Sequence, residues 1–166
     1  NASLGEMFNQ LSSKGINIPD GFALSADAYR LFRKENKIEQ PLNDLLESLD
    51  RKNLSNLSSI GEKARELISK SVLPEEVKKQ CKEAYFNLCE QCGIKVLDVA
   101  VRSSATAEDL PTASFAGRME SFLNISGLEQ LLDAIHRCYI SLFTDRAIKY
   151  RHDMGFVDMD IAISAG

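Results

Sequence analysis

The chain has 166 residues, of which 44% are hydrophobic and 27% charged, and its formal net charge is −4. This size and composition allow one compact domain with a buried core. Acidic and basic residues are interleaved without a basic stripe, and no apolar run approaches the ~20 residues of a transmembrane helix. We therefore expect neither nucleic acid nor a membrane as a partner, and nothing in the sequence suggests secretion.

The first part of the chain predicts two helices separated by a turn and a short strand. Ser3 and Glu6 have the spacing of a capping box, and Gly15 is a natural end for the helix that they begin. A proline-containing turn then precedes a short predicted strand at residues 22–24. Ser25 is expected to cap the second helix.

Residues 40–92 predict a mostly helical region, because apolar residues recur three and four positions apart in each of its segments. Pro74 suits the first turn of the last helix in this region, and Gly93 suits its C-terminal end. We expect the charged outer positions of these helices to form a solvated surface.

The cysteines Cys81, Cys89, Cys92 and Cys138 raise the question of a zinc or redox site. Cys89 and Cys92 form a CxxC pair, but the chain has no second CxxC and no histidine at ligand spacing from it. Both cysteines also fall on the apolar face of a predicted helix. We therefore expect buried, reduced thiols, which fit a cytoplasmic location.

Strands and helices alternate after residue 93 in the predicted pattern. Residues 94–102 are rich in β-branched side chains and predict a buried strand with Arg102 at its end. Residues 120–125 predict a second strand, and an amphipathic helix is expected to follow it. A further helix is expected over residues 145–155. The whole pattern predicts an α+β fold that is rich in helices and has a small sheet.

The two ends of the chain suggest a piece of a longer polypeptide. The chain opens on "NAS" without a methionine, directly before a helical pattern, and closes on the apolar, strand-like "DIAISAG". We therefore expect residues 1–166 to be a single fragment of one domain, truncated at both ends.

A polar loop, "RSSATAEDLPTASFAGRME", lies between the two predicted strands. Hydroxyls and open backbone amides bind phosphate oxygens, glycine allows a ligand to approach closely, and arginine supplies a permanent charge. The chain has neither a GxxxxGK[ST] nor a GxGxxG pattern, so a P-loop or Rossmann site is unsupported. Loops are also often polar without binding a ligand, and Arg102 could instead pair with Glu108 or Asp109. The candidate donors in the loop are Ser103, Ser104, Thr106, Thr112, Ser114 and Gly117.

The stretch "VRSSATAEDLPTASFAG", followed by "ESFLNI", closely resembles the nucleotide-binding domain of the phosphoenolpyruvate synthase (pyruvate, water dikinase) family. "NASLGEM", "GINIPDGFAL" and "AYRLF" resemble the start of that domain, and "SLFTDRAIKYRHDMGF" and "IAISAG" resemble its later part. The resemblance runs over the whole chain, and residues 40–92 are its least characteristic region. It implies the N-terminal portion of an ATP-grasp-like nucleotide-binding domain.

The resemblance also implies a large enzyme in which this domain transfers phosphate from ATP to a histidine on a swivelling domain. The phosphohistidine then serves a pyruvate/phosphoenolpyruvate barrel. The net reaction would convert ATP, pyruvate and water to AMP, phosphoenolpyruvate and phosphate, with Mg²⁺ required. By resemblance, Arg102 would contact the ATP phosphates. The residues expected to line the nucleotide site or to shape its phosphate loop are Gly117, Ser121, Ser103, Ser104 and Thr106.

The chain departs from the family pattern in several places. The family usually has two glutamines after "FAG", where this chain has Arg118 and Met119, and an extra cation there could alter nucleotide affinity. The family's ATP-binding lysine lies immediately before "NAS", and its acidic Mg²⁺ ligands lie in the later half of the domain. Neither His136 nor His152 lies in the phosphohistidine motif, so both are expected to be ordinary surface or packing residues. We expect no catalytic residue and no metal ligand in this chain, and no activity from the fragment alone.

Related enzymes are alternatives to this assignment. Rifampin phosphotransferase shares nearly the same loop, and pyruvate, phosphate dikinase and the glucan, water dikinases share the domain. Pyruvate, phosphate dikinase usually carries a loop rich in Met and Pro, so it fits less well. An alternative from another class is a degenerate ATP-grasp-like module that binds a partner without catalysis.

Overall fold

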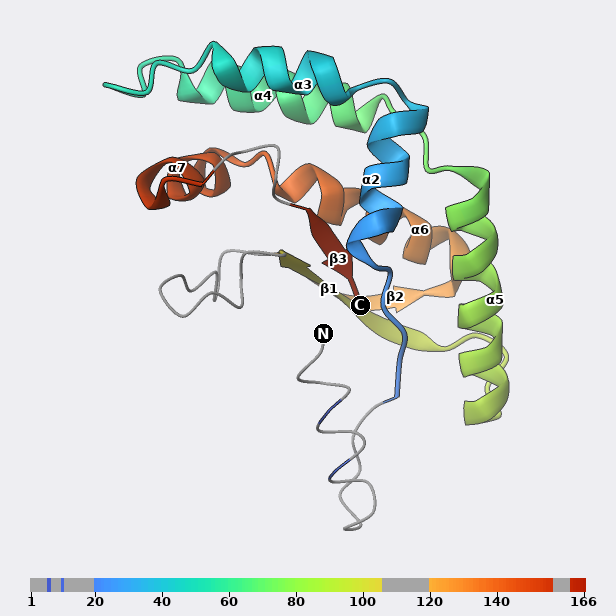
Figure 1. The fold of residues 1–166 in the computed structure, drawn as a ribbon. Helices are drawn as coiled ribbons and strands as arrows, with labels where there is room; N and C mark the ends of the chain where they lie inside the picture. Colours follow the sequence, from blue (N-terminus) through green and yellow to red (C-terminus); the bar gives the residue numbers. More distant parts are fainter. Residues whose placement is uncertain (1–5, 7–9, 11–19, 106–119, 157–161) are drawn as a thin grey trace.

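The computed structural model describes residues 6, 10, 20–105, 120–156 and 162–166 of the chain (Figure 1). The helix predicted from Ser3 to Gly15 lies almost entirely outside these residues. The elements of the first half are helices α2 (Ala26–Glu35), α3 (Glu39–Glu47), α4 (Leu57–Ser69) and α5 (Glu75–Cys92). The elements of the second half are strands β1 (Asp98–Ala105) and β2 (Ser121–Ser126), helices α6 (Gly127–Ser141) and α7 (Asp145–Met154), and strand β3 (Ile163–Ala165).

The strands form one three-stranded sheet in the order β2-β1-β3, and both neighbouring pairs are antiparallel. The predicted α+β fold, rich in helices with a small sheet, is therefore confirmed. At the outer side of β3, Leu24 forms a single bridge with Ala165. The prediction of a strand over residues 22–24 is wrong in extent, because only Leu24 of this segment pairs with the sheet.

β1 starts and ends later than predicted, at Asp98 and Ala105. The preceding segment is held by α5 instead, because the Tyr85 hydroxyl donates to the carbonyl oxygen of Leu97 at 2.8 Å and accepts from its N–H at 3.0 Å. At the other end, β1 continues by pairing with β3. Arg102 therefore lies inside the strand, whereas the sequence placed it at the strand's end.

β2 carries a β-bulge in its pairing with β1. Val99 pairs with Ile125 and Val101 with Phe122, so β2 has one residue more than β1 between these two pairs. Within this step, Asn124 has a φ of 56°, a left-handed conformation that asparagine adopts more readily than most residues. The bulge thus sets the register of the remainder of the pair.

The helix ends mostly follow the sequence signals. Gly93 and Gly155 end α5 and α7 in the left-handed conformation, with φ of 68° and 70°. The Thr144 side chain accepts a hydrogen bond from the Ala147 N–H at the start of α7. Pro74 directly precedes α5 and is not its first residue, and the Ser25 side chain makes no capping hydrogen bond.

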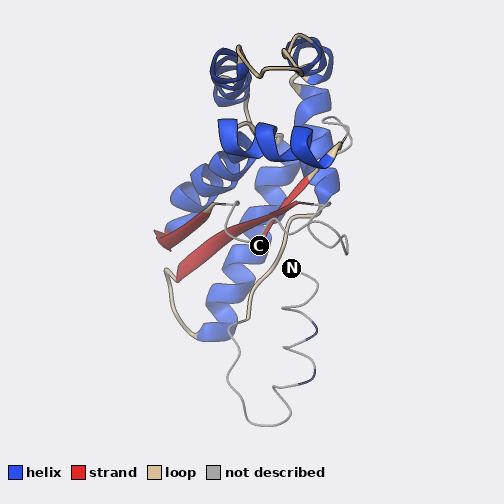
Figure 2. Cartoon of the chain, turned by 90° about the vertical axis from the view of Figure 1, so that its left-hand side faces the viewer, coloured by secondary structure: helices blue, strands red, loops and turns tan. Residues whose placement is uncertain are grey.

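Helices α6 and α2 pack against one face of the sheet, while α3, α4 and α7 lie together beyond it (Figures 1 and 2). The core between them is partly aromatic: the Tyr139 ring lies 5.0 Å from Tyr29 and 5.1 Å from Phe32. Arg151 is also buried, and its guanidinium donates to the Leu142 carbonyl oxygen at 2.5 Å. Among the described helices, those that contact the sheet most, α6 and α2, therefore share one of its faces.

Candidate functional site

The side chains of β1 alternate between the two faces of the sheet. Val101 and Ser103 are buried on the face that the helices cover, whereas Arg102 is exposed and Ser104 is half-buried. Residues that lie directly opposite in an antiparallel pair share a face, so the cross-strand partners of Arg102 and Ser104 lie with them. We call this the open face. Its polar members beside Arg102 are Ser104, Ser121 and Ser164, and Asp98 lies on it at the start of β1.

Arg102 lies directly opposite Ser121 across the β1–β2 pair. The Ser103 N–H donates to the Glu120 carbonyl oxygen at 3.3 Å, so the Arg102–Ser121 pair is the non-hydrogen-bonded kind, in which Cα atoms lie about 4.5 Å apart and side chains are close. On its other side, Arg102 exchanges backbone hydrogen bonds of 2.7 and 2.9 Å with Gly166. The sheet therefore fixes the position from which the Arg102 side chain extends.

The Arg102 guanidinium has no hydrogen-bond or ion-pair partner within the part of the chain that the structure describes. Arg65 is different, because it forms an ion pair of 3.0 Å with Asp145. Glu108 and Asp109, the alternative partners considered for Arg102, lie outside the described residues. An exposed arginine that forms no ion pair with a described residue is suited to bind an oxyanion, since its planar fork matches phosphate oxygens.

The other predicted site residues do not all lie on the open face. The Ser103 hydroxyl lies on the covered face and donates to the Glu120 carbonyl oxygen at 3.2 Å, so it links β1 to β2 and does not meet Arg102. Ser104 does share the open face with Arg102. The predicted loop residues that lie outside the described part of the chain are Thr106, Thr112, Ser114, Gly117, Arg118 and Met119.

Sequence reasoning missed Ser164, which β3 places opposite Ser104 on the open face. The alternation in "IAISAG" already separates Ser164 from its apolar neighbours, which are both buried. The pattern does not reveal which strand lies beside β3, however, so this serine could not be connected with Arg102 from the sequence.

The cysteines are all free, and three of them, Cys81, Cys89 and Cys138, are buried. Cys92 is exposed at the end of α5, so the prediction that it is buried is wrong. Burial raises the pKa of the Cys81 thiol to about 11 and that of Cys138 to about 12. Among the described residues, no three His, Cys, Asp or Glu side chains form a group that could hold a metal ion.

The two histidines have packing roles, as predicted. The His136 Nε2 lies 2.8 Å from the Ile68 carbonyl oxygen, and its ring lies 5.7 Å from that of Phe32. The His152 Nε2 lies 2.8 Å from the Arg51 carbonyl oxygen. Each ring thus joins a helix of the second half to the end of a helix or to a loop of the first half.

No helix in the described ranges has the length and apolar character needed to cross a membrane.

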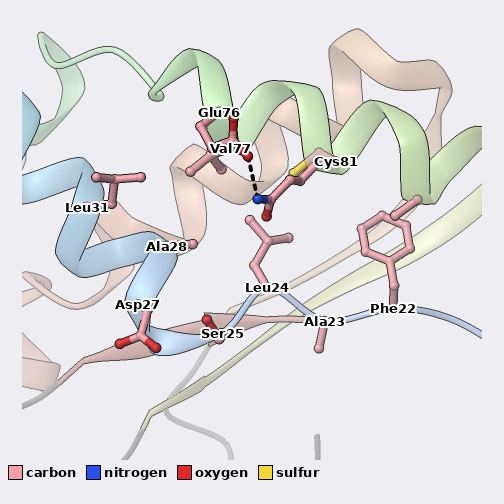
Figure 3. Close-up of a pocket in the computed structure, with 12 residues that line it drawn as sticks. Phe22, Ala23, Leu24, Ser25, Asp27, Ala28, Leu31, Glu76, Val77 and Cys81 are labelled. Carbon is pink, nitrogen blue, oxygen red and sulfur yellow. Dashed lines mark hydrogen bonds between the residues drawn. The ribbon is translucent and has the colours of Figure 1, made fainter.

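A hollow of about 420 Å³ lies between residues 22–31 and α5 (Figure 3). Leu24 points from the sheet edge toward α5, so the hollow opens on the covered side and not beside Arg102. Its charged lining residues are Asp27 and Glu76, and its described lining contains no lysine or arginine. A phosphate would be repelled there, so this hollow is unsuited to bind the ATP phosphates. The apolar part of the lining includes Phe22, Leu24, Leu31, Val77 and Cys81.

Comparison with known proteins agrees with the resemblance found in the sequence. The family model described as "Pyruvate phosphate dikinase, AMP/ATP-binding domain" matches residues 1–166. The chain is 50% identical to phosphoenolpyruvate synthase of Synechocystis over 100% of its length, and this covers 21% of that relative. The corresponding enzymes of Neisseria meningitidis and Aquifex aeolicus are 44% and 45% identical over the whole chain, which covers 21% and 19% of them.

The chain thus spans about a fifth of the length of these relatives. The model match covers all of the chain, including the helical region that the sequence motifs left least certain. The chain therefore belongs to the family of the pyruvate phosphate dikinase AMP/ATP-binding domain.

Proposed function

We propose that the protein carrying this chain is a phosphoenolpyruvate synthase. It uses ATP to phosphorylate one of its own histidines and then passes that phosphate to pyruvate. The net reaction converts ATP, pyruvate and water to AMP, phosphoenolpyruvate and phosphate. The match to the AMP/ATP-binding domain family and the identities of 50, 44 and 45% to proteins named phosphoenolpyruvate synthase support this proposal.

The observation that supports the proposal within this chain is the cross-strand pairing of Arg102 with Ser121. In the proposed function, the Arg102 guanidinium binds ATP phosphate oxygens and the Ser121 hydroxyl donates to the same nucleotide. Phosphoryl transfer depends on positioning and charge neutralisation, and a strand-held arginine without a described acidic partner can supply both. The remaining residues proposed for the nucleotide site and its loop are Gly117, Ser103, Ser104 and Thr106.

The proposal includes groups beyond this chain. Mg²⁺ would neutralise phosphate charge when bound, and the family resemblance assigns its acidic ligands to the later half of the domain. The phosphohistidine swivel domain and the pyruvate/phosphoenolpyruvate barrel are assigned to other parts of the protein. Residues 1–166 alone would then be an incomplete piece of the nucleotide-binding domain and would have no activity. The free cysteines favour a cytoplasmic enzyme.

The test is the reaction of the full-length protein with ATP, Mg²⁺ and pyruvate. AMP, phosphoenolpyruvate and phosphate are measured separately, and all three are expected to form in equal amounts. Removing pyruvate should stop turnover and leave a phosphohistidine that is stable in alkali and labile in acid. Formation of ADP in place of AMP, or no phosphoenolpyruvate from pyruvate, would contradict the proposed function.

A further inference from the structure

The open face carries apolar as well as polar side chains. Ala100 lies two positions from Arg102 on β1, and Leu123 lies two positions from Ser121 on β2, so each points to the same side of the sheet as its polar neighbour. Ala100 is exposed, and Leu123 is 62% exposed, the largest fraction among the large hydrophobic residues that the structure describes. Solvent, and therefore a ligand, reaches both side chains.

The neighbours of Leu123 on β2 take the covered face instead. Phe122 packs against the core, and the Arg137 Cζ on α6 lies 4.2 Å from the centre of its ring. Ile125, which follows the bulge, is buried opposite Val99. β2 therefore packs two of its apolar side chains against the core and presents the third, Leu123, to solvent, where it adds little to the hydrophobic stability of the described fold.

A single exposed leucine is ordinary on a protein surface, but the place of Leu123 on this face is informative. Along the face, Arg102 opposite Ser121 is followed by Ala100 and Leu123, and then by the exposed Asp98 at the start of β1. A polyanion is attracted by the arginine and repelled by the carboxylate. Bound phosphates should therefore lie at Arg102, and a part of the ligand that extends over Ala100 and Leu123 should be uncharged.

ATP has the same order of parts, because its charged triphosphate is joined directly to an uncharged nucleoside. Two positions along a strand span about 7 Å, so a nucleotide whose phosphates are held by Arg102 and Ser121 can place its nucleoside over Leu123. Beside Leu123, the Ala100 side chain is only a methyl group, so it does not stand in the way. Covering Leu123 in this way removes apolar surface from water and favours binding.

We propose that Leu123 is a nucleotide-contact residue, whose side chain packs against the nucleoside of the ATP molecule whose phosphates Arg102 and Ser121 bind. The inference rests on the proposed function of the same site and gives that site a direction, with the phosphates at Arg102 and the nucleoside toward Asp98. Leu123 then contributes to the affinity for ATP and not to the affinity for an inorganic polyphosphate.

The experiment uses the full-length protein with the substitutions Leu123→Ala, which shortens the side chain, and Leu123→Met, which nearly keeps its volume and its apolar character. Val72→Ala is the matched control, because Val72 lies between α4 and α5 and is 61% exposed. Four quantities are measured for each protein: the KM for ATP, the KM for pyruvate, the inhibition constant of tripolyphosphate competing with ATP, and the melting temperature.

Leu123→Ala should raise the KM for ATP about tenfold, the factor expected from losing most of a covered leucine side chain. Leu123→Met should restore it, and Val72→Ala should equal the wild type. The inhibition constant of tripolyphosphate should not change in Leu123→Ala, because tripolyphosphate has no nucleoside, and neither should the KM for pyruvate or the melting temperature. Arg102→Ala should show the complementary result and raise the inhibition constant of tripolyphosphate.

Each other outcome overturns the assignment of Leu123. If Leu123→Ala equals the wild type while Arg102→Ala is impaired, Leu123 lies outside the nucleotide site although the proposed function stands. If Leu123→Ala raises the KM for ATP and the inhibition constant of tripolyphosphate alike, it acts by positioning Ser121. A lower melting temperature with changes in both KM values would mean that another part of the protein covers Leu123.

Two results with the wild-type protein would also overturn the inference. If tripolyphosphate does not compete with ATP, the proposed direction of the nucleotide on the sheet is wrong. If the protein forms no AMP from ATP and pyruvate, the proposed function fails, and the inference fails with it.

Discussion

Arg102 and Ser121 lie side by side on the exposed face of the sheet, although the whole polar loop separates them in the sequence. The pair is created by the return of β2 along β1, in a register that the bulge at Asn124 sets. The sequence therefore encloses the loop between two strands whose facing residues are a cation and a hydroxyl. Substitutions of Arg102, before the loop, and of Ser121, after it, can therefore test the proposed phosphate-binding role of the loop.

Replacing Arg102 should weaken the use of ATP strongly. Arg102→Ala removes a charged, forked donor and should lower kcat/KM for ATP by a factor of about 100, since several charge-assisted hydrogen bonds are lost together. Arg102→Lys should recover only part of this, because an ammonium cannot form the paired contact. Arg146 is an exposed arginine on α7, and Arg146→Ala is the matched control. Equal phosphohistidine formation by the Arg102→Ala and wild-type proteins at low ATP would refute the assigned contact.

Ser121 should act through its hydroxyl. Ser121→Ala is expected to raise the KM for ATP about tenfold, whereas Ser121→Thr keeps the hydroxyl and should remain close to the wild type. Steady-state kinetics of the full-length protein at varied ATP and saturating pyruvate give the comparison. A threonine variant as impaired as the alanine variant would mean that the space around Ser121 matters and its hydroxyl does not.

Local patterns predicted the helices better than the sheet. Periodicity, Gly93 and Gly155 marked α5 and α7 because a helix closes its hydrogen bonds within one segment. β1 could not be bounded in this way, since its start depends on the Tyr85 hydroxyl and its end on β3, which both lie far from it in the sequence.

The candidate site shows the same limit. The motif identified Arg102 and Ser121, because the family resemblance depends on their local sequence. It could not show that Ser103 points to the covered face, where its hydroxyl bonds to Glu120, or that Ser164 lies near Arg102. Both facts depend on strand register, which a single strand's pattern does not contain.

Gly61 should be intolerant of a side chain, although it lies inside a helix where alanine is normally preferred. A Cβ there would lie 2.7 Å from the Asp145 Oδ1, 2.8 Å from the Arg65 Nη1 and 3.2 Å from the Phe143 carbonyl oxygen. The two nearest atoms are the paired ends of the Arg65 and Asp145 side chains, so Gly61→Ala should push this ion pair apart and crowd the Phe143 carbonyl. We expect a cost of up to about 3 kcal/mol, which exceeds the ~1 kcal/mol that alanine gains in a helix. Hydrogen exchange in α4 and in residues 143–147 should accelerate.

The control for Gly61 is Ser59→Ala, because Ser59 is exposed in the same helix. This variant should exchange like the wild type. Unchanged or slower exchange in Gly61→Ala would show that α4 can move away from the start of α7 without cost.

Two buried tyrosines offer a matched comparison of hydroxyl contributions. The Tyr85 hydroxyl bonds to both backbone groups of Leu97, whereas the Tyr139 hydroxyl has no hydrogen-bond partner among the described residues. Tyr85→Phe should lower the free energy of unfolding by about 1–3 kcal/mol, because it leaves backbone groups unsatisfied. Tyr139→Phe should be neutral or stabilising. Hydrogen exchange of α5 and α6 in the full-length protein measures both, and a larger loss for Tyr139→Phe would contradict this account.

The thiols should differ in reactivity according to burial and protonation. Burial raises the pKa of Cys81 to about 11 and that of Cys138 to about 12, above the ordinary value of 9.0. Iodoacetamide at pH 9 should therefore alkylate the exposed Cys92 first and leave Cys81 and Cys138 intact, because the thiolate is the reacting species. Peptide mass spectrometry of the labelled full-length protein gives the order of modification.

The same pKa shifts determine whether the free energy of unfolding rises or falls with pH. Well below pH 9 both thiols are protonated in the folded and in the unfolded chain, so they add no pH dependence to stability there. Between pH 9 and about 11 the unfolded chain loses these protons while the folded chain keeps them, so the free energy of unfolding should fall as the pH rises. In urea, where burial is lost, Cys81 and Cys138 should be alkylated at pH 9 as fast as Cys92. Rapid labelling of Cys138 without urea would show that α6 opens in the native protein. The Cys138 thiol would then not contribute to the fall in the free energy of unfolding.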